Sequence, residues 1–137
     1  MKPDYITKFD YLFLGALILD LFVVIAGWDW ILAAGHEQLI RGGAEPEMLE
    51  ILPAYTVTFM TIRFAIMFGI WMSISLFRIG FMRYILALWM VYSIYSMITG
   101  FQLLTLFFQL SGLIVLMMNL AALFFVFRPK SIAWLEG

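Results

Sequence analysis

The segment AYTVTFMTIRFAIMFGIWMSISLF, residues 54–77, determines the class of this protein. Its side chains are mostly apolar, and about 20 apolar residues in a helix are enough to cross the hydrocarbon core of a bilayer. One arginine, Arg63, lies well inside the segment. A charged side chain at the centre of a membrane span costs about 3 kcal/mol on insertion scales. We therefore expect a polar partner for Arg63.

The composition places the whole chain among integral membrane proteins. Of its 137 residues, 65% are hydrophobic and 12% are charged, whereas soluble domains are about 25% charged. The formal net charge of -1 gives no basic excess of the kind that nucleic-acid-binding domains carry. The lipid bilayer is therefore the expected partner, and no nucleic-acid partner is predicted.

Four segments are long enough to cross the membrane. The stretch 84–127 is too long for one crossing, and it is divided near Thr99, Gly100 and Gln102, its most polar and flexible group. Residues 1–10 are expected to form a short charged tail. The predicted spans are residues 11–32, 54–77, 84–99 and 105–127. The sequence thus predicts an all-α integral membrane protein, an antiparallel four-transmembrane-helix bundle, in one domain that covers residues 1–137.

The topology follows from the positions of the cations. Residues 33–53 form the predicted external acidic loop, which holds four glutamates and one cation, Arg41. In this loop Pro46 allows a short amphipathic turn at the membrane surface, and Pro53 is expected to open the second span. With four spans, the other side of the membrane receives Lys2, Lys8, Arg78, Arg83, Arg128 and Lys130. The excess of lysine and arginine in cytoplasmic segments then predicts a multi-pass protein of the cell membrane, or of the inner membrane in a bacterium, with both termini inside.

The depth of Arg63 suggests two alternative acidic partners, and the absence of any acidic partner is the third possibility. Asp20 and Arg63 each lie about 14 Å into their spans at 1.5 Å per residue, and the two helices enter from opposite faces. Both side chains therefore reach the midplane, where an ion pair would lower the cost of burying each charge. Asp29 is the alternative partner, because side chains tilt toward the N-terminus of their helix and Arg63 thus leans toward the end of the first span.

Other polar side chains are expected at a similar depth. Tyr92 and Ser93 lie near the middle of the third span, and Asn119 lies in the fourth. Because polar groups in lipid need partners, these residues are expected to face the interior with Asp20 and Arg63. This intramembrane polar cluster allows two interpretations: a buried network that fixes helix register, or a site that binds or moves a ligand.

The second span also carries a helix-packing stripe of small residues. Its members recur every four residues and are Thr61, Ala65, Gly69 and Ser73. Such a stripe permits close approach of another helix. It points about 160° away from Arg63, at 100° per residue. The partner is either another helix of this chain, which we favour, or a second copy.

Several kinds of chemistry are excluded or disfavoured. The chain has no cysteine, which excludes disulfides and thiolate metal sites, and its single histidine, His36, cannot supply a pair of axial haem ligands. Phosphate loops, nucleophile elbows and zinc-protease motifs are absent from the sequence. No catalytic residue, metal or cofactor is therefore predicted.

The segment YLFLGALILDL, residues 11–21, resembles the first helix of the small multidrug resistance transporters. The resemblance implies a four-helix protein in which the embedded acid, here Asp20, exchanges protons for a cationic substrate. The chain departs from that pattern by aspartate in place of glutamate, by Arg63 and by its long first loop. Membership of the family is not inferred.

Two hypotheses for the function follow. The favoured one is a non-enzymatic accessory or scaffold subunit, or a small homo-oligomer, stabilised by the polar cluster. The alternative is a small transporter or channel whose pathway passes Asp20 and Arg63, since charges inside a membrane often mark such pathways.

Overall fold

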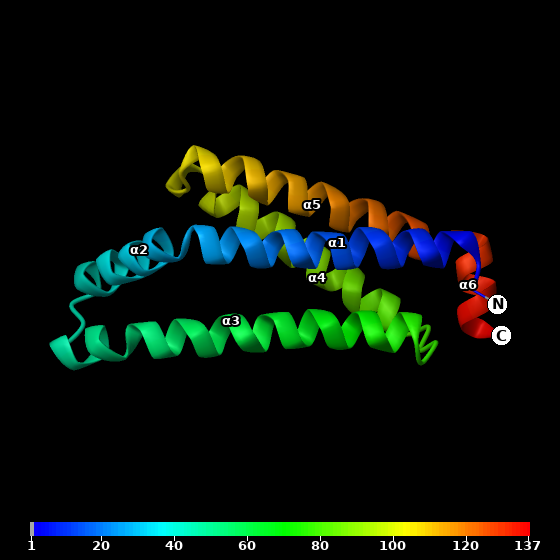
Figure 1. Cartoon of the computed structure of the whole chain (residues 1–137), viewed down its shortest axis with the longest axis horizontal. Coiled ribbons are helices and arrows are strands. Elements are labelled where there is room, and N and C mark those ends of the chain that lie inside the picture. The colour runs from blue at the N-terminus through cyan, green and yellow to red at the C-terminus, as the bar shows by residue number, and fades with distance from the viewer. Residues whose placement is uncertain (1) are drawn as a thin grey trace.

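The computed structural model describes residues 2–137, and these residues are almost entirely helical, without a strand (Figure 1). Six α-helices follow one another along the chain, with one short 3-10 helix, η1, between the fourth and the fifth. The elements are α1 (Asp4–Ala26), α2 (Trp28–Arg41), α3 (Pro46–Ser75), α4 (Met82–Gly100), η1 (Phe101–Leu103), α5 (Leu106–Val126) and α6 (Pro129–Glu136).

Four of the described helical segments are long and apolar enough to cross a membrane. They are Asp4–Ala26, Pro46–Ser75, Met82–Leu103 and Leu106–Val126. The expectation of a helical, multi-pass membrane protein is confirmed at this level. The N- and C-termini lie at the same end of the molecule (Figure 1).

The charged N-terminal lead is not a tail, because α1 already begins at Asp4. Pro3 has an extended conformation at the N-cap, and Asp4 places a negative charge in the first turn, which is favourable at the positive end of the helix dipole. Ile6 and Phe9 are fully buried, so the first two turns pack into the core. Position 1 lies outside the described residues.

The acidic segment 33–53 is also largely helical. After a break at Gly27, α2 runs to Arg41, and α3 starts at Pro46 and passes through Pro53. Pro46 stands at the first helical position, where its missing N–H costs nothing. The prediction that Pro53 opens the second span is wrong, because Pro53 lies inside α3, where it gives up one helical hydrogen bond.

Almost all buried residues lie toward the termini. Among the described residues, only Val24 and Gly27 are buried outside the ranges 2–16, 67–90 and 122–137, which we call the terminal half. Its core includes the fully buried side chains of Ile6, Phe9, Phe13, Ile74, Leu86 and Val126. We call residues 24–60 and 93–115 the far half.

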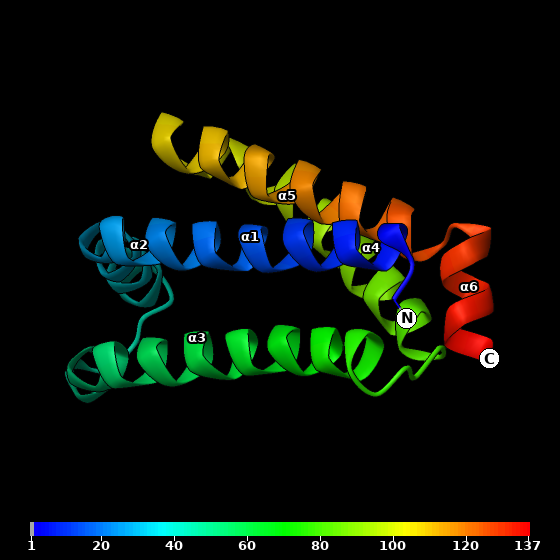
Figure 2. The same cartoon turned by 45° about the vertical axis from the view of Figure 1, so that its right-hand side comes forward.

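Helix α1 occupies the centre of the molecule. It lies between α5 on one side and α3 on the other, in both views (Figure 2). It stays close to α5 along its length: a side chain added at Gly15 would meet Met118, and one at Gly27 would meet Phe108. By contrast, the buried side chains of α3 all lie in its C-terminal part, from Met67 onward.

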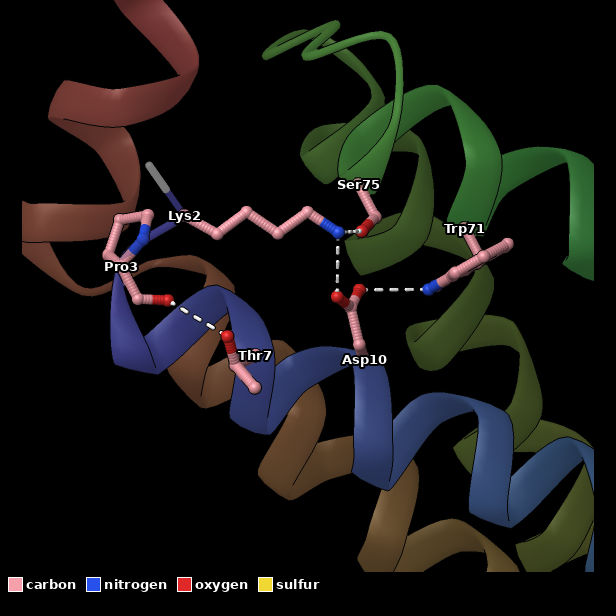
Figure 3. A network of polar contacts seen from close by, with 6 residues as sticks. All are labelled: Lys2, Pro3, Thr7, Asp10, Trp71 and Ser75. Carbon is pink, nitrogen blue, oxygen red and sulfur yellow. Dashed lines mark hydrogen bonds and ion pairs between the residues drawn. The ribbon is translucent and has the colours of Figure 1, made fainter.

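Polar contacts tie the elements together at the terminal end (Figure 3). The Lys2 ammonium donates to Asp10 Oδ2 at 3.0 Å and to Ser75 Oγ at 2.6 Å. The indole N–H of Trp71 donates to the other Asp10 oxygen at 2.9 Å. Asp10 thus joins α1 to the end of α3.

A short C-terminal helix, α6, closes the same end. The sequence predicts that Pro129 ends the last helix, and it does follow α5, but it also starts α6 as the first helical residue. Arg83 donates to Glu136 at 2.9 Å, and Arg78 Nε donates to the carbonyl of Trp134 at 3.1 Å. These contacts hold α6 against the start of α4 and the loop before it.

Candidate functional site

The guanidinium of Arg63 donates a hydrogen bond to the carboxylate of Asp20, and the two form an ion pair between α3 and α1. The other acid considered for Arg63, Asp29, is exposed in the first turn of α2. Gly27 separates Asp29 from the helix that carries Asp20. At the start of α2 a carboxylate is stabilised by the helix dipole and needs no cation.

The long arginine side chain of α3 reaches across to Asp20 of α1. On its way it passes close to neighbours in its own helix: Nη1 lies 3.9 Å from the sulfur of Met60, and the guanidinium lies 5.3 Å from the centre of the Phe64 ring. The pair is only partly buried, with exposed fractions of 32% for the Arg63 side chain and 20% for that of Asp20. One side of the pair is therefore open to its surroundings.

A cleft of about 380 Å³ lies beside the ion pair, and all four long helices contribute to its walls. The residues of the predicted polar cluster all line this cleft, namely Asp20, Arg63, Tyr92, Ser93 and Asn119. A smaller cavity of about 250 Å³ also has Asp20 and Arg63 in its wall, together with Trp30 and Ser111. The ion pair thus borders both cavities.

The polar groups of the cleft do not form one closed network. Ser93 Oγ donates to the carbonyl of Trp89 at 2.9 Å, within its own helix. Among residues 2–137, the Tyr92 hydroxyl and the Asn119 amide make no side-chain hydrogen bond with the protein. A phenol and an amide therefore remain available to water or to a ligand.

The structure adds cleft residues that were not singled out from the sequence. Trp89, Ser96 and Met97 line the same cleft as Tyr92 and Ser93. They recur at the three- and four-residue spacing that places side chains on one face of a helix, so periodicity around Tyr92 could have identified them. No group of three or more acidic or histidine side chains that could hold a metal ion occurs among the described residues.

Glycines allow the close helix contacts beside the cleft. A Cβ atom at Gly112 of α5 would lie 2.7 Å from the terminal carbon of Met97 on α4. At Gly27, where α1 ends, a Cβ would overlap the ring of Phe108. The Phe108 ring also packs on Trp30, with 4.5 Å between the ring centres. These contacts hold α5 against α4 and against the junction of α1 with α2.

The small-residue stripe faces away from the cleft. Thr61 and Ala65 are exposed and line an apolar groove of about 710 Å³ between α1 and α3. At Gly69 an added Cβ would meet nothing within 4 Å. Thr61 and Ser73 each donate to a carbonyl one turn earlier in α3, at 2.8 Å. Within the described chain, therefore, no close helix contact is formed at Gly69, and the stripe is exposed at Thr61 and Ala65.

Comparison with known proteins finds no protein-family model, no curated protein and no solved structure that matches this chain. The resemblance of residues 11–21 to the small multidrug resistance transporters thus stays a local likeness. The function is inferred from the geometry of the chain itself.

Proposed function

We propose that this chain is a non-enzymatic, four-span membrane protein that acts as an accessory or scaffold subunit of a larger membrane assembly, or as a homo-oligomer. Its spans form an antiparallel bundle with both termini in the cytoplasm. One observation carries the proposal: α3 is held to α1 by the Asp20–Arg63 pair, while its opposite face is exposed. The protein needs no metal or cofactor in this role.

The exposed face of α3 suits contact with another membrane helix. Thr61 and Ala65 are small and exposed, and the space at Gly69 is open. Apolar helix surfaces gain little free energy by moving from lipid into a helix–helix contact. Small residues promote association in the membrane because they let two helix backbones pack closely. Arg63 lies on the other side of α3 from the stripe. Its ion pair with Asp20 would therefore turn the stripe away from the cleft.

A cysteine crosslinking experiment tests this role. The chain contains no cysteine, so Gly69→Cys introduces a single thiol at the centre of the stripe. We expect oxidation in native membranes to yield a disulfide-linked dimer or a conjugate with a larger polypeptide. Val91→Cys is the matched control, because Val91 is exposed on α4, away from the stripe. Absence of any adduct of Gly69→Cys, or equal adducts of both variants, would overturn the assembly role.

The distribution of charge supports the proposed orientation. Six of the eight lysines and arginines lie near the helix ends of the terminal half, whereas Arg41 lies at the far end beside four glutamates. Lysine and arginine are enriched on the cytoplasmic side of membrane proteins. Protease protection of tags at the two termini checks this: cleavage of the two tags from opposite sides would contradict the orientation.

A second candidate function, a small transporter or channel, is favoured by the cleft. The partly exposed ion pair, the Tyr92 hydroxyl and the Asn119 amide give a solute both donors and acceptors at the depth of the membrane centre. Flux of ions, protons and small solutes into proteoliposomes tests this candidate. Flux that Asp20→Asn abolishes would support transport, and absence of any flux sensitive to that replacement would exclude it.

A further inference from the structure

Two cations meet on one aromatic ring where α5 ends and α1 begins. The guanidinium of Arg128 lies 5.5 Å from the centre of the Tyr5 ring, and the Lys8 ammonium also lies 5.5 Å from it. Tyr5 stacks on Phe125 of α5 with 5.9 Å between ring centres, which fixes its position. The arrangement places two positive charges around one ring at the end of a membrane span.

These cations have no acidic partner within the described residues. The four ion pairs found there involve Lys2, Arg41, Arg63 and Arg83, and neither Lys8 nor Arg128 takes part. The Nε atom of Arg128 is buried without a hydrogen-bond partner in the same residues. Lys8 also lines a second groove, of about 600 Å³, with Lys2, Lys130 and a single acid, Asp4. Positive charge is therefore in excess on this surface.

An apolar groove runs from Arg128 toward the membrane interior. Its volume is about 390 Å³, and its walls are formed by Leu120, Leu123, Phe124 and Phe127. These four residues have the spacing of one face of α5, and Arg128 and Pro129 close the groove at the helix end. A hydrocarbon chain would therefore lie along α5 with a polar group beside the Arg128 guanidinium.

We infer that this surface binds a phospholipid with a negatively charged head group. The groove along α5 would take an acyl chain, and Arg128 and Lys8 would contact the phosphate. Basic side chains at a helix end, at the level of the head groups, are the usual means by which membrane proteins select anionic lipids. The inference does not depend on the proposed function or on the orientation of the chain, because both leaflets contain phospholipids.

Lipid binding to the purified full-length protein in detergent tests the inference. Phosphatidylglycerol and phosphatidylcholine with identical acyl chains are titrated, and bound lipid is counted by native mass spectrometry. We expect phosphatidylglycerol to bind about tenfold more tightly. The double variant Lys8→Gln/Arg128→Gln should lose this preference. Arg41→Gln, which removes an exposed cation at the opposite end, should keep it.

Two further variants separate lipid contact from folding. Arg128→Lys keeps the charge and should keep most of the preference, so a loss in the double variant that Arg128→Lys does not share is due to charge. Leu123→Trp should fill the apolar groove and weaken the binding of both lipids without changing the ratio of their affinities. Equal binding of the two lipids by the wild-type protein would overturn the inference. So would a preference that survives the double replacement, or one that Arg41→Gln removes equally.

Discussion

The terminal half and the far half share the four long helices but are packed differently. In the terminal half, α1, α3, α4 and α5 all bury side chains in one core, and polar contacts tie the helix ends to each other and to α6. In the far half, α2 buries no residue and the N-terminal part of α3 is largely exposed. The Asp20–Arg63 pair lies at the border between the two.

This difference indicates where stability and function reside. Regions with few buried contacts open at lower free-energy cost than a packed core, and ligand- or partner-binding surfaces are often found there. The terminal half, with its packed core, is therefore expected to be the more stable part of the fold. The cleft and the exposed face of α3, the two surfaces that a ligand or a partner helix could use, lie largely outside the packed core of the terminal half.

The largest expected effect is on the core of the terminal half. Phe13 is fully buried, and Phe13→Ala should lower the free energy of unfolding by about 3 kcal/mol through lost packing and the cavity left behind. Phe22→Ala in the same helix is the control. Because Phe22 is 65% exposed, its replacement should lower the free energy of unfolding by well under half as much. Unfolding in detergent, followed by circular dichroism, measures both. Equal losses for the two variants would mean that Phe13 does not belong to a tightly packed core.

A smaller effect is expected where α1 meets α5 in the far half. Gly27→Ala brings a methyl group into the Phe108 ring and should destabilise the protein by about 2 kcal/mol through overpacking. Phe108→Leu in the same chain should relieve part of this loss, because the smaller side chain leaves room for the methyl group. Strict additivity of the two substitutions would mean that Gly27 and Phe108 do not touch.

The smallest effect concerns the tie between α4 and α6. Arg83 is buried, whereas its partner Glu136 is mostly exposed, with side-chain exposures of 7% and 61%. Glu136→Gln removes the negative charge beside the buried Arg83 guanidinium and should lower the free energy of unfolding by about 1 kcal/mol. The loss is smaller than for a fully buried ion pair, because solvent reaches the glutamate. Glu47→Gln on the exposed start of α3 should change the melting temperature very little. If the two variants melt alike, α6 is not fixed by this pair.

Much of the helical pattern, and the residues around the cleft, could be predicted from the sequence. Counting residues from the start of each predicted span places Asp20 and Arg63 at the same depth in the membrane, because each residue of a helix adds the same rise. The starts of α1 and α3 were predicted too late, because charged lead residues and glutamates can occupy helix ends that leave the hydrocarbon core. The helix α6 was missed because a proline that ends one helix also favours the start of the next.

The exposure of the N-terminal part of α3 could not be predicted. In a soluble protein an apolar face indicates the core, but lipid is as apolar as leucine, so hydrophobicity does not distinguish a face that packs on a helix from one that contacts lipid. Tyr92 illustrates this: it borders the cleft and is nevertheless 63% exposed. The direction of the small-residue stripe was ambiguous for the same reason.

The claim that the Asp20–Arg63 pair holds α3 on α1 is tested most directly by a double-mutant cycle. Thermal unfolding in detergent is measured for the wild type, Asp20→Asn, Arg63→Gln and the double variant, with the exposed Glu37–Arg41 pair taken through the same cycle as a control. We predict a coupling of about 1–2 kcal/mol between Asp20 and Arg63, little coupling in the control pair, and partial recovery in the charge-swapped variant Asp20→Arg/Arg63→Asp. Additive effects of Asp20→Asn and Arg63→Gln, or unchanged stability of both single variants, would contradict the account.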